Sequence, residues 1–81
     1  MRVKVKFFAV LRERIGKPEL TVEIEEGTTV GALWESLRKE HPRLPSSDMK
    51  LLYAVNRQYV GTDHVLRDQD EVVFVPPVSG G

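Results

Sequence analysis

The chain has 81 residues, 30% of them charged, with 12 Lys and Arg balanced against 12 Asp and Glu and no cysteine. This length corresponds to one domain, whose small core contributes only modest stability. Without cysteine there is no thiol nucleophile and no Cys-ligated zinc or iron–sulfur site. The zero formal charge argues against a nucleic-acid partner, because nucleic-acid-binding domains normally carry a clustered basic excess.

The N-terminal segment, residues 2–7, alternates basic and apolar side chains. Period two predicts a strand with Val3, Val5 and Phe7 on its buried face. The next residue, Phe8, then falls on the charged face, where an apolar side chain is unexpected. Because lysines interrupt the apolar residues, the segment resembles neither a signal peptide nor a membrane span, so we expect a cytoplasmic protein with no membrane partner.

The remaining elements follow from periodicity and stop signals. The sequence predicts a short helix from residue 9 to Gly16, a strand over 20–24, a main helix from about 30 to 40, strands over 51–55 and 71–75, and a short edge strand at 59–60. This order predicts an α+β domain over residues 1–75. We expect a ubiquitin-like β-grasp fold, in which a mixed sheet of four to five strands carries one main helix across one face.

Two features of the strands lead to further expectations. Thr21 and Glu23 of the second strand are expected opposite Lys4 and Lys6. The last strand is apolar on both faces, since Val72 and Phe74 share one face and Val73 and Val75 share the other. Isolated exposed apolar residues are ordinary, but Phe8, Val73 and Val75 near one sheet edge indicate a partner surface as readily as a face covered by loops.

Residues 76–81, Pro-Pro-Val-Ser-Gly-Gly, are predicted to form an extended C-terminal tail. Pro76 and Pro77 hold the chain extended and cannot donate to a sheet ladder, so the tail should leave the domain. Gly80 and Gly81 lack Cβ, which lets a narrow tunnel close around them. A diglycine end is usually a disordered terminus or an expression scar, but its place after a stiff stalk favours a chemical use of the Gly81 carboxyl group.

An ionised carboxylate is a poor electrophile until adenylation turns it into a mixed anhydride that a sulfur or amine nucleophile can attack. We therefore expect a non-catalytic carrier with no cofactor of its own, for which an activating enzyme supplies ATP and Mg²⁺. No metal site is expected either, because His41 and His64 have no ligand spacing with the carboxylates.

Three blocks of the sequence, residues 4–9 with 11–13, residues 50–56 and residues 66–81, resemble the MoaD-type small subunit of molybdopterin synthase, a sulfur carrier of the MoaD/ThiS family. The last block is the most specific. Every ubiquitin-like carrier shares Gly-Gly, whereas Pro-Pro-Val-Ser-Gly-Gly after Asp-Glu-Val is characteristic of this family.

The resemblance implies that a MoeB-type, E1-like enzyme adenylates Gly81, and that a sulfur donor such as a cysteine desulfurase supplies sulfur for a thiocarboxylate. A MoaE-type large subunit, in a heterotetramer, would use this sulfur for the molybdopterin dithiolene in molybdenum cofactor biosynthesis. The tail residues implied to enter the partner's active site are Pro76, Pro77, Val78, Ser79 and Gly80. The implied docking face comprises Phe8, Tyr59 and Val75, with Val73 added from periodicity.

The sequence departs from the family pattern at two positions. Gln69 stands where the family often has Gly, and Val75 where it often has a large aromatic residue. Alternative functions are a sulfur carrier for thiazole synthesis or tRNA thiolation, and a ubiquitin-like modifier joined through Gly81 to a lysine. A plain β-grasp interaction module with an idle tail is the third alternative.

Overall fold

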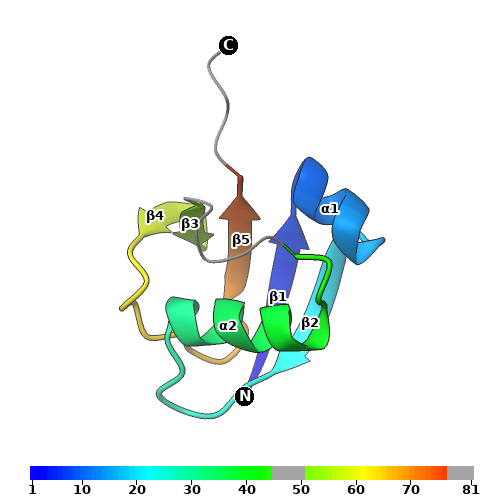
Figure 1. Cartoon of the computed structure of the whole chain (residues 1–81). Helices are drawn as coiled ribbons and strands as arrows, with labels where there is room; N and C mark the ends of the chain where they lie inside the picture. Colours follow the sequence, from blue (N-terminus) through cyan, green and yellow to red (C-terminus); the bar gives the residue numbers. More distant parts are fainter. Residues whose placement is uncertain (45–50, 77–81) are drawn as a thin grey trace.

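The structure is a computed structural model that describes residues 1–44 and 51–76. Its elements in chain order are β1 (Arg2–Phe7), α1 (Val10–Ile15), β2 (Glu19–Glu23), α2 (Val30–Glu40), β3 (Leu52–Val55), β4 (Gln58–Val60) and β5 (Glu71–Val75) (Figure 1). Every predicted helix and strand is present, with shifts of a residue or so at the ends. No helix within the described ranges is both long enough and apolar enough to cross a membrane.

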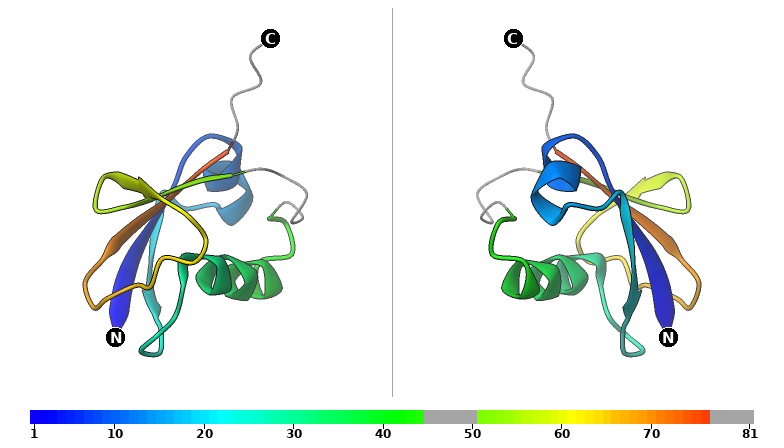
Figure 2. Two further views of the ribbon diagram at one scale, coloured as in Figure 1. Left: turned by 90° about the vertical axis from the view of Figure 1, so that its left-hand side faces the viewer. Right: turned by 90° about the vertical axis from the view of Figure 1, so that its right-hand side faces the viewer.

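The strands form one five-stranded sheet in the order β2-β1-β5-β3-β4. The central pair, β1 and β5, is parallel, and the other neighbours are antiparallel. Both helices lie on one side of the sheet, and α2 crosses that face (Figure 2). The predicted β-grasp architecture is therefore confirmed, with a mixed sheet and one main helix.

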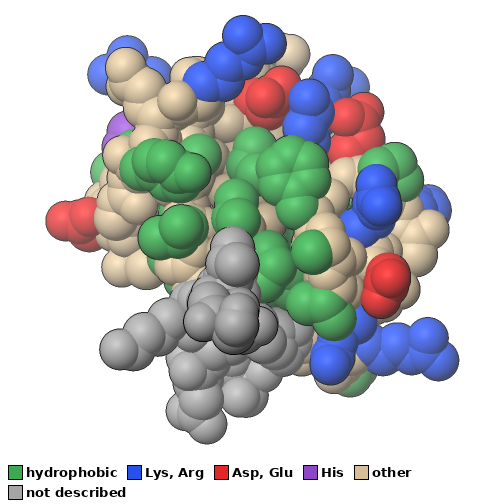
Figure 3. Space-filling view, turned by 90° about the horizontal axis from the view of Figure 1, so that it is seen from above, with side chains coloured by type: hydrophobic (Ala, Val, Ile, Leu, Met, Phe, Trp, Pro, Cys, Tyr) green, Lys and Arg blue, Asp and Glu red, His purple; other side chains and the backbone are tan. Residues whose placement is uncertain are grey.

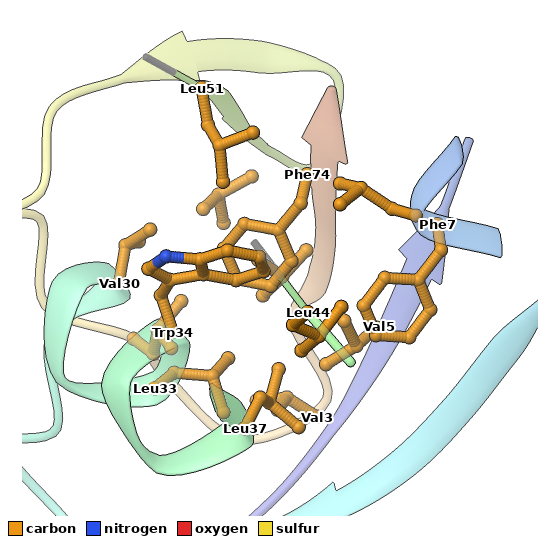
Figure 4. Close-up of a cluster of buried hydrophobic side chains, with 14 residues drawn as sticks. Val3, Val5, Phe7, Val30, Leu33, Trp34, Leu37, Leu44, Leu51 and Phe74 are labelled. Atoms are coloured by element: carbon orange, nitrogen blue, oxygen red, sulfur yellow. The ribbon is translucent and has the colours of Figure 1, made fainter. Parts of the chain in front are cut away.

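The core lies between α2 and the sheet and is centred on Phe74 of β5 (Figure 4). The Phe74 ring lies 4.9 Å from that of Trp34 on α2, and Tyr53 of β3 meets it edge-on at 5.7 Å. Burial raises the pKa of the Tyr53 hydroxyl, with a smaller contribution from the charge of Glu35. The buried stripe of α2 is the one that its periodicity predicts: Val30, Leu33, Trp34 and Leu37.

The helix boundaries lie where the capping and stop signals of the sequence predict them. At the start of α2, the Thr29 hydroxyl oxygen accepts a hydrogen bond of 3.1 Å from the Ala32 N–H. The helix ends at Glu40, with His41 as its C-cap, just before Pro42, which cannot continue the hydrogen-bond ladder. Gly16 ends α1 with φ 84°, a left-handed conformation that favours glycine.

The register between β1 and β2 corrects one expectation. Thr21 lies opposite Lys4 as predicted, but Glu23 lies opposite Arg2, and their side chains form an ion pair of 3.0 Å. Because the strands are antiparallel, later residues of β2 meet earlier residues of β1, so Lys6 cannot face Glu23. Lys6 instead lies opposite Glu19 and forms a 3.3 Å ion pair with Glu71 of β5.

Candidate docking face and carrier tail

The parallel pairing of β1 and β5 places the start of the tail beside the end of β1. Phe7 lies opposite Phe74, so the C-terminal ends of both strands lie side by side at the same end of the sheet. Phe8 follows β1 and Pro76 follows β5 at this end of the sheet. The ends of β1 and β5 therefore lie side by side (Figure 1), and Phe8, which follows β1, is exposed.

An apolar cluster occupies the sheet face opposite α2. Strand pairing brings its members together, since Val75 lies opposite Leu52, and Ala54 lies between Val73 and Tyr59. Phe8 joins them from the end of β1. We call this set the docking patch; it comprises Phe8, Leu52, Ala54, Tyr59, Val73 and Val75.

The docking patch is open to a partner. Tyr59 is 74% exposed, Leu52 52% and Phe8 50%, whereas the inward-facing Val72 and Phe74 are fully buried. All four residues predicted for the docking face line one shallow depression of about 330 Å³. Seen from above the view of Figure 1, hydrophobic side chains gather in the middle of the molecule, and charged ones lie around them (Figure 3). Large exposed apolar areas with polar rims are typical of protein-binding surfaces.

Charged residues lie at the rim of the depression. Lys6 and Glu71 form their ion pair along one side, and Arg57, in the turn between β3 and β4, lines the depression too. Arg57 has φ 72° in this tight turn, and it lines the same depression as Tyr59. Rim charges of this kind set the specificity and rate of docking more than its affinity.

Leu52 and Ala54 belong to the patch but were not predicted as site residues. The signal was present, because residues 51–55 are apolar on both faces. A strand that is buried on one face only should alternate with polar residues. The uninterrupted apolar run therefore indicated that both faces of this strand are covered, either within the core or by a partner.

The chemistry available on this surface is that of binding. The docking patch consists of apolar and aromatic side chains, and its rim of an ion pair and a guanidinium group. Across residues 1–44 and 51–76, no three His, Asp or Glu side chains gather to hold a metal ion. Of the predicted tail, the structure describes Pro76, half-buried directly after β5; Pro77, Val78, Ser79, Gly80 and Gly81 lie outside the described residues.

The mixed sheet, the helix across one face and the apolar patch on the other define a ubiquitin-like β-grasp protein. A profile described as the ThiS family matches residues 5–81, and the chain belongs to that family.

Individual relatives cover nearly the whole chain. The molybdopterin synthase sulfur carrier subunit of Escherichia coli (strain K12) is 44% identical, over 98% of this chain and 99% of the relative. The protein of the same name from Mycobacterium tuberculosis (strain H37Rv) is 38% identical, over 100% of this chain and 99% of the relative.

Solved structures confirm the fold. Small archaeal modifier protein 1 (SAMP1) of Haloferax volcanii matches with a TM-score of 0.86 at 27% identity and covers 100% of both chains. A molybdopterin-converting factor complex of subunits 1 and 2 from Helicobacter pylori contains a chain that matches with a TM-score of 0.69 at 23% identity, again over 100% of both chains.

Proposed function

We propose that this chain is the sulfur carrier subunit of a molybdopterin synthase, and that it carries sulfur as a thiocarboxylate on Gly81. The observation that carries the proposal is the 44% identity to the Escherichia coli subunit of that name, which extends over almost the full length of both proteins. The docking patch beside the start of the tail supports it, because a carrier needs a binding surface close to its reactive end.

The loading of sulfur is proposed to proceed in three steps. The Gly81 carboxylate attacks the α-phosphate of ATP in an E1-like enzyme of the MoeB type, which forms the acyl adenylate and releases pyrophosphate. A persulfide from a sulfur donor, such as a cysteine desulfurase, then displaces AMP and forms an acyl disulfide. A second thiol of the donor system cleaves the S–S bond, leaving the thiocarboxylate and an oxidised disulfide.

This chain contributes the carboxylate and the means of presenting it. ATP and Mg²⁺ are bound by the activating enzyme, and synthesis of the dithiolene takes place in a MoaE-type large subunit. Pro76 and Pro77 keep the start of the tail extended. Val78 to Gly81 enter the partner's active site, where the glycines, which lack Cβ, fit a narrow passage. The chain is thus a non-catalytic subunit that works in the cytoplasm.

One surface serves both partners in this proposal. The docking patch is the large apolar area next to Pro76, so an enzyme that receives the tail must cover it. Since the activating enzyme and the synthase subunit both receive the tail, they compete for the patch. The carrier therefore has to leave one before it joins the other.

The test is an intact-mass measurement after incubation with an E1-like enzyme, ATP and a sulfur donor. The proposal expects one oxygen to be replaced by sulfur, only when ATP is present. The loaded carrier should then give molybdopterin with the large subunit. Failure to acquire sulfur from any such enzyme overturns the proposal, and sulfur transfer only to a thiazole or tRNA substrate favours one of the other carriers.

A protein modifier is the second candidate, because the chain shares its fold over the full length with SAMP1. A modifier uses the same adenylate but passes the carbonyl to a lysine amine, which releases the activating group and forms an isopeptide bond. The same mass measurement, made on a mixture with target proteins, separates the two candidates. Conjugates of higher mass that need Gly81 would identify a modifier.

A further inference from the structure

The outer edge of β2 is a second surface without a neighbour in the described part of the chain. β2 lies at one end of the sheet, and no helix or strand of the described residues runs along its outer side (Figure 2). Edge strands are commonly protected by being short, as is β4 with three residues. β2 has five residues, and within them neither proline nor lysine protects the edge.

The backbone of β2 has hydrogen-bonding groups free for an added strand. Met1 and Ile24 exchange both backbone hydrogen bonds, at 3.0 and 2.8 Å, and Phe7 N–H donates to the Pro18 carbonyl at 3.0 Å. In an antiparallel pair such bonds involve every second residue, so the even-numbered residues of β2 face β1. Glu19, Thr21 and Glu23 therefore direct their N–H and C=O groups to the open edge.

A groove runs beside this edge, between β2 and α2. Its volume is about 360 Å³, and its apolar lining includes Val22, Ile24, Leu33 and Leu37. Glu25 and Glu40 also line it. Because side chains alternate along a strand, a strand added to β2 would place every second side chain over this groove.

Charge decides which kind of segment fits. The stretch Glu-Leu-Thr-Val-Glu-Ile-Glu-Glu, residues 19–26, has four glutamates and no basic residue. Only Glu23 among them forms an ion pair in the described residues, with Arg2. If a second copy paired with β2 about Thr21, Glu19 would oppose Glu23 of the other copy, and like charges directly opposite one another are destabilising.

β1 shows what a favourable neighbour of β2 looks like. Its basic residues lie opposite Glu19, Thr21 and Glu23 on the outer face, while its valines are buried in the core. We propose that the free edge of β2 and the adjacent groove bind an extended segment of another protein by strand addition, and that this segment alternates basic and apolar residues. Its apolar side chains enter the groove, and its basic ones lie beside the glutamates.

This surface goes beyond the proposed sulfur-carrier function. β2 and β4 lie at opposite ends of the sheet, so the new edge is remote from Tyr59 in the docking patch. A segment bound to β2 leaves the patch and the start of the tail uncovered. The carrier can then be held by one protein while it exchanges between the enzymes that receive its tail.

The test is an NMR titration of the full chain at low salt with a capped peptide, Arg-Val-Lys-Val-Lys-Phe, copied from residues 2–7. We expect chemical-shift changes and added hydrogen-exchange protection at the amides of Thr21 and Glu23. Thr21→Pro removes an N–H that β1 does not use and should weaken binding by at least about tenfold. Thr21→Val keeps that N–H and should bind like the unaltered chain.

Two peptides test the same bonds without altering the protein. One peptide is N-methylated at both valines and the other at both lysines. Successive N–H groups of a strand point to opposite edges, so the valine amides and the lysine amides cannot both face β2. Only one of the two peptides therefore retains the N–H groups that bond to β2. One should bind and the other should not; equal binding by both overturns the proposal. So does unchanged binding to a folded Thr21→Pro variant, an absence of binding, or a response centred on Phe8 and Tyr59. A dimer of the unaltered chain that Thr21→Pro dissociates would identify a second copy as the occupant and overturn it as well.

Discussion

The side-chain amide of Asn56 donates a hydrogen bond of 2.8 Å to the carboxylate of Asp70. This contact joins the turn between β3 and β4 to the start of β5. The side-chain oxygen of Asn56, Oδ1, accepts a hydrogen bond of 3.0 Å from the Glu71 backbone N–H. The second carboxylate oxygen of Asp70 accepts one of 2.8 Å from the Arg67 backbone N–H. Asp70 is 8% exposed and is the only charged residue that is buried within the described ranges. The turn beside the docking patch is therefore held by a partly buried polar network.

Asn56→Ala should lower the free energy of unfolding by about 1–3 kcal/mol, because it leaves a buried carboxylate without one of its donors. Urea denaturation measures this loss. Gln58→Ala, an exposed substitution in the neighbouring β4, is the control and should change stability by at most about 0.5 kcal/mol. Equal losses in the two variants would mean that the Asn56–Asp70 bond is not what stabilises the turn.

Gln69→Gly should stabilise the domain. Gln69 has φ 70°, and a left-handed conformation costs a residue with Cβ about 1–2 kcal/mol. Glycine avoids this cost but makes the unfolded chain more flexible, by roughly 0.4–1 kcal/mol. The expected net gain is about 0.5–1 kcal/mol, seen as a higher Tm. Gln58→Gly, at a position without positive φ, should lower the Tm instead; a parallel fall in both variants would contradict the strain at Gln69.

Asp68 should make stability depend on acid pH. Its carboxylate accepts a hydrogen bond of 2.8 Å from the Arg2 backbone N–H, and this bond is the main reason why the pKa of Asp68 lies below its ordinary value of 3.8. A lowered folded-state pKa means that the stabilisation is present above 3.8 and is lost as the pH falls through the folded-state value.

The comparison for this prediction is Asp68→Asn, which keeps an oxygen for the Arg2 N–H but has no proton to bind. Thermal unfolding between neutral and strongly acid pH should show a smaller loss of stability for Asp68→Asn than for the unaltered chain. Identical slopes of stability against pH in the two proteins would exclude Asp68 as the titrating group.

The fold follows from local patterns that the core reinforces. The strand β1 was predictable because Val3, Val5 and Phe7 alternate with charges, and α2 because its apolar residues share one helical face. The register was not predictable in the same way. The partners of Lys6, which are Glu19 and Glu71, depend on strand direction and sheet order, neither of which is encoded in the period of a single strand.

The residues of the candidate site also fall into two groups, those that a local pattern predicts and those that depend on strand pairing. Phe8, Val73 and Val75 were identified because each breaks the polar pattern expected on an exposed face. Leu52 and Ala54 were missed as site residues because an apolar run on both faces is equally consistent with a fully buried strand. Only the pairing of β3 with β5 places them next to Val75 and Val73. The tail was predicted from its motif, and its residues from Pro77 onward remain predictions.

Tyr59→Asp should weaken binding to the large synthase subunit by about 2 kcal/mol or more, as expected for a central aromatic residue of an interface. The monomer should keep its stability to within about 0.5 kcal/mol, because Tyr59 is 74% exposed. Phe74→Ala, on the buried face of the same sheet, should cost about 3–5 kcal/mol and serves as the core control. Calorimetric titration measures affinity and thermal unfolding measures stability. A large fall in Tm for Tyr59→Asp would show that its ring belongs to the core.

One alanine added after Gly81 should abolish sulfur loading completely. The added residue moves the carboxylate beyond the point where the activating enzyme adenylates it, and the internal Gly81 carbonyl becomes an unreactive amide. Docking should persist, because the patch from Phe8 to Val75 is unchanged, so the extended chain should still compete with the unaltered one for the activating enzyme. Ser79→Ala keeps both the length and the terminal carboxylate, and it should still be loaded with sulfur. Intact mass after incubation with ATP and the sulfur donor distinguishes the variants, and an extended chain that still gained sulfur would locate the carrier group elsewhere.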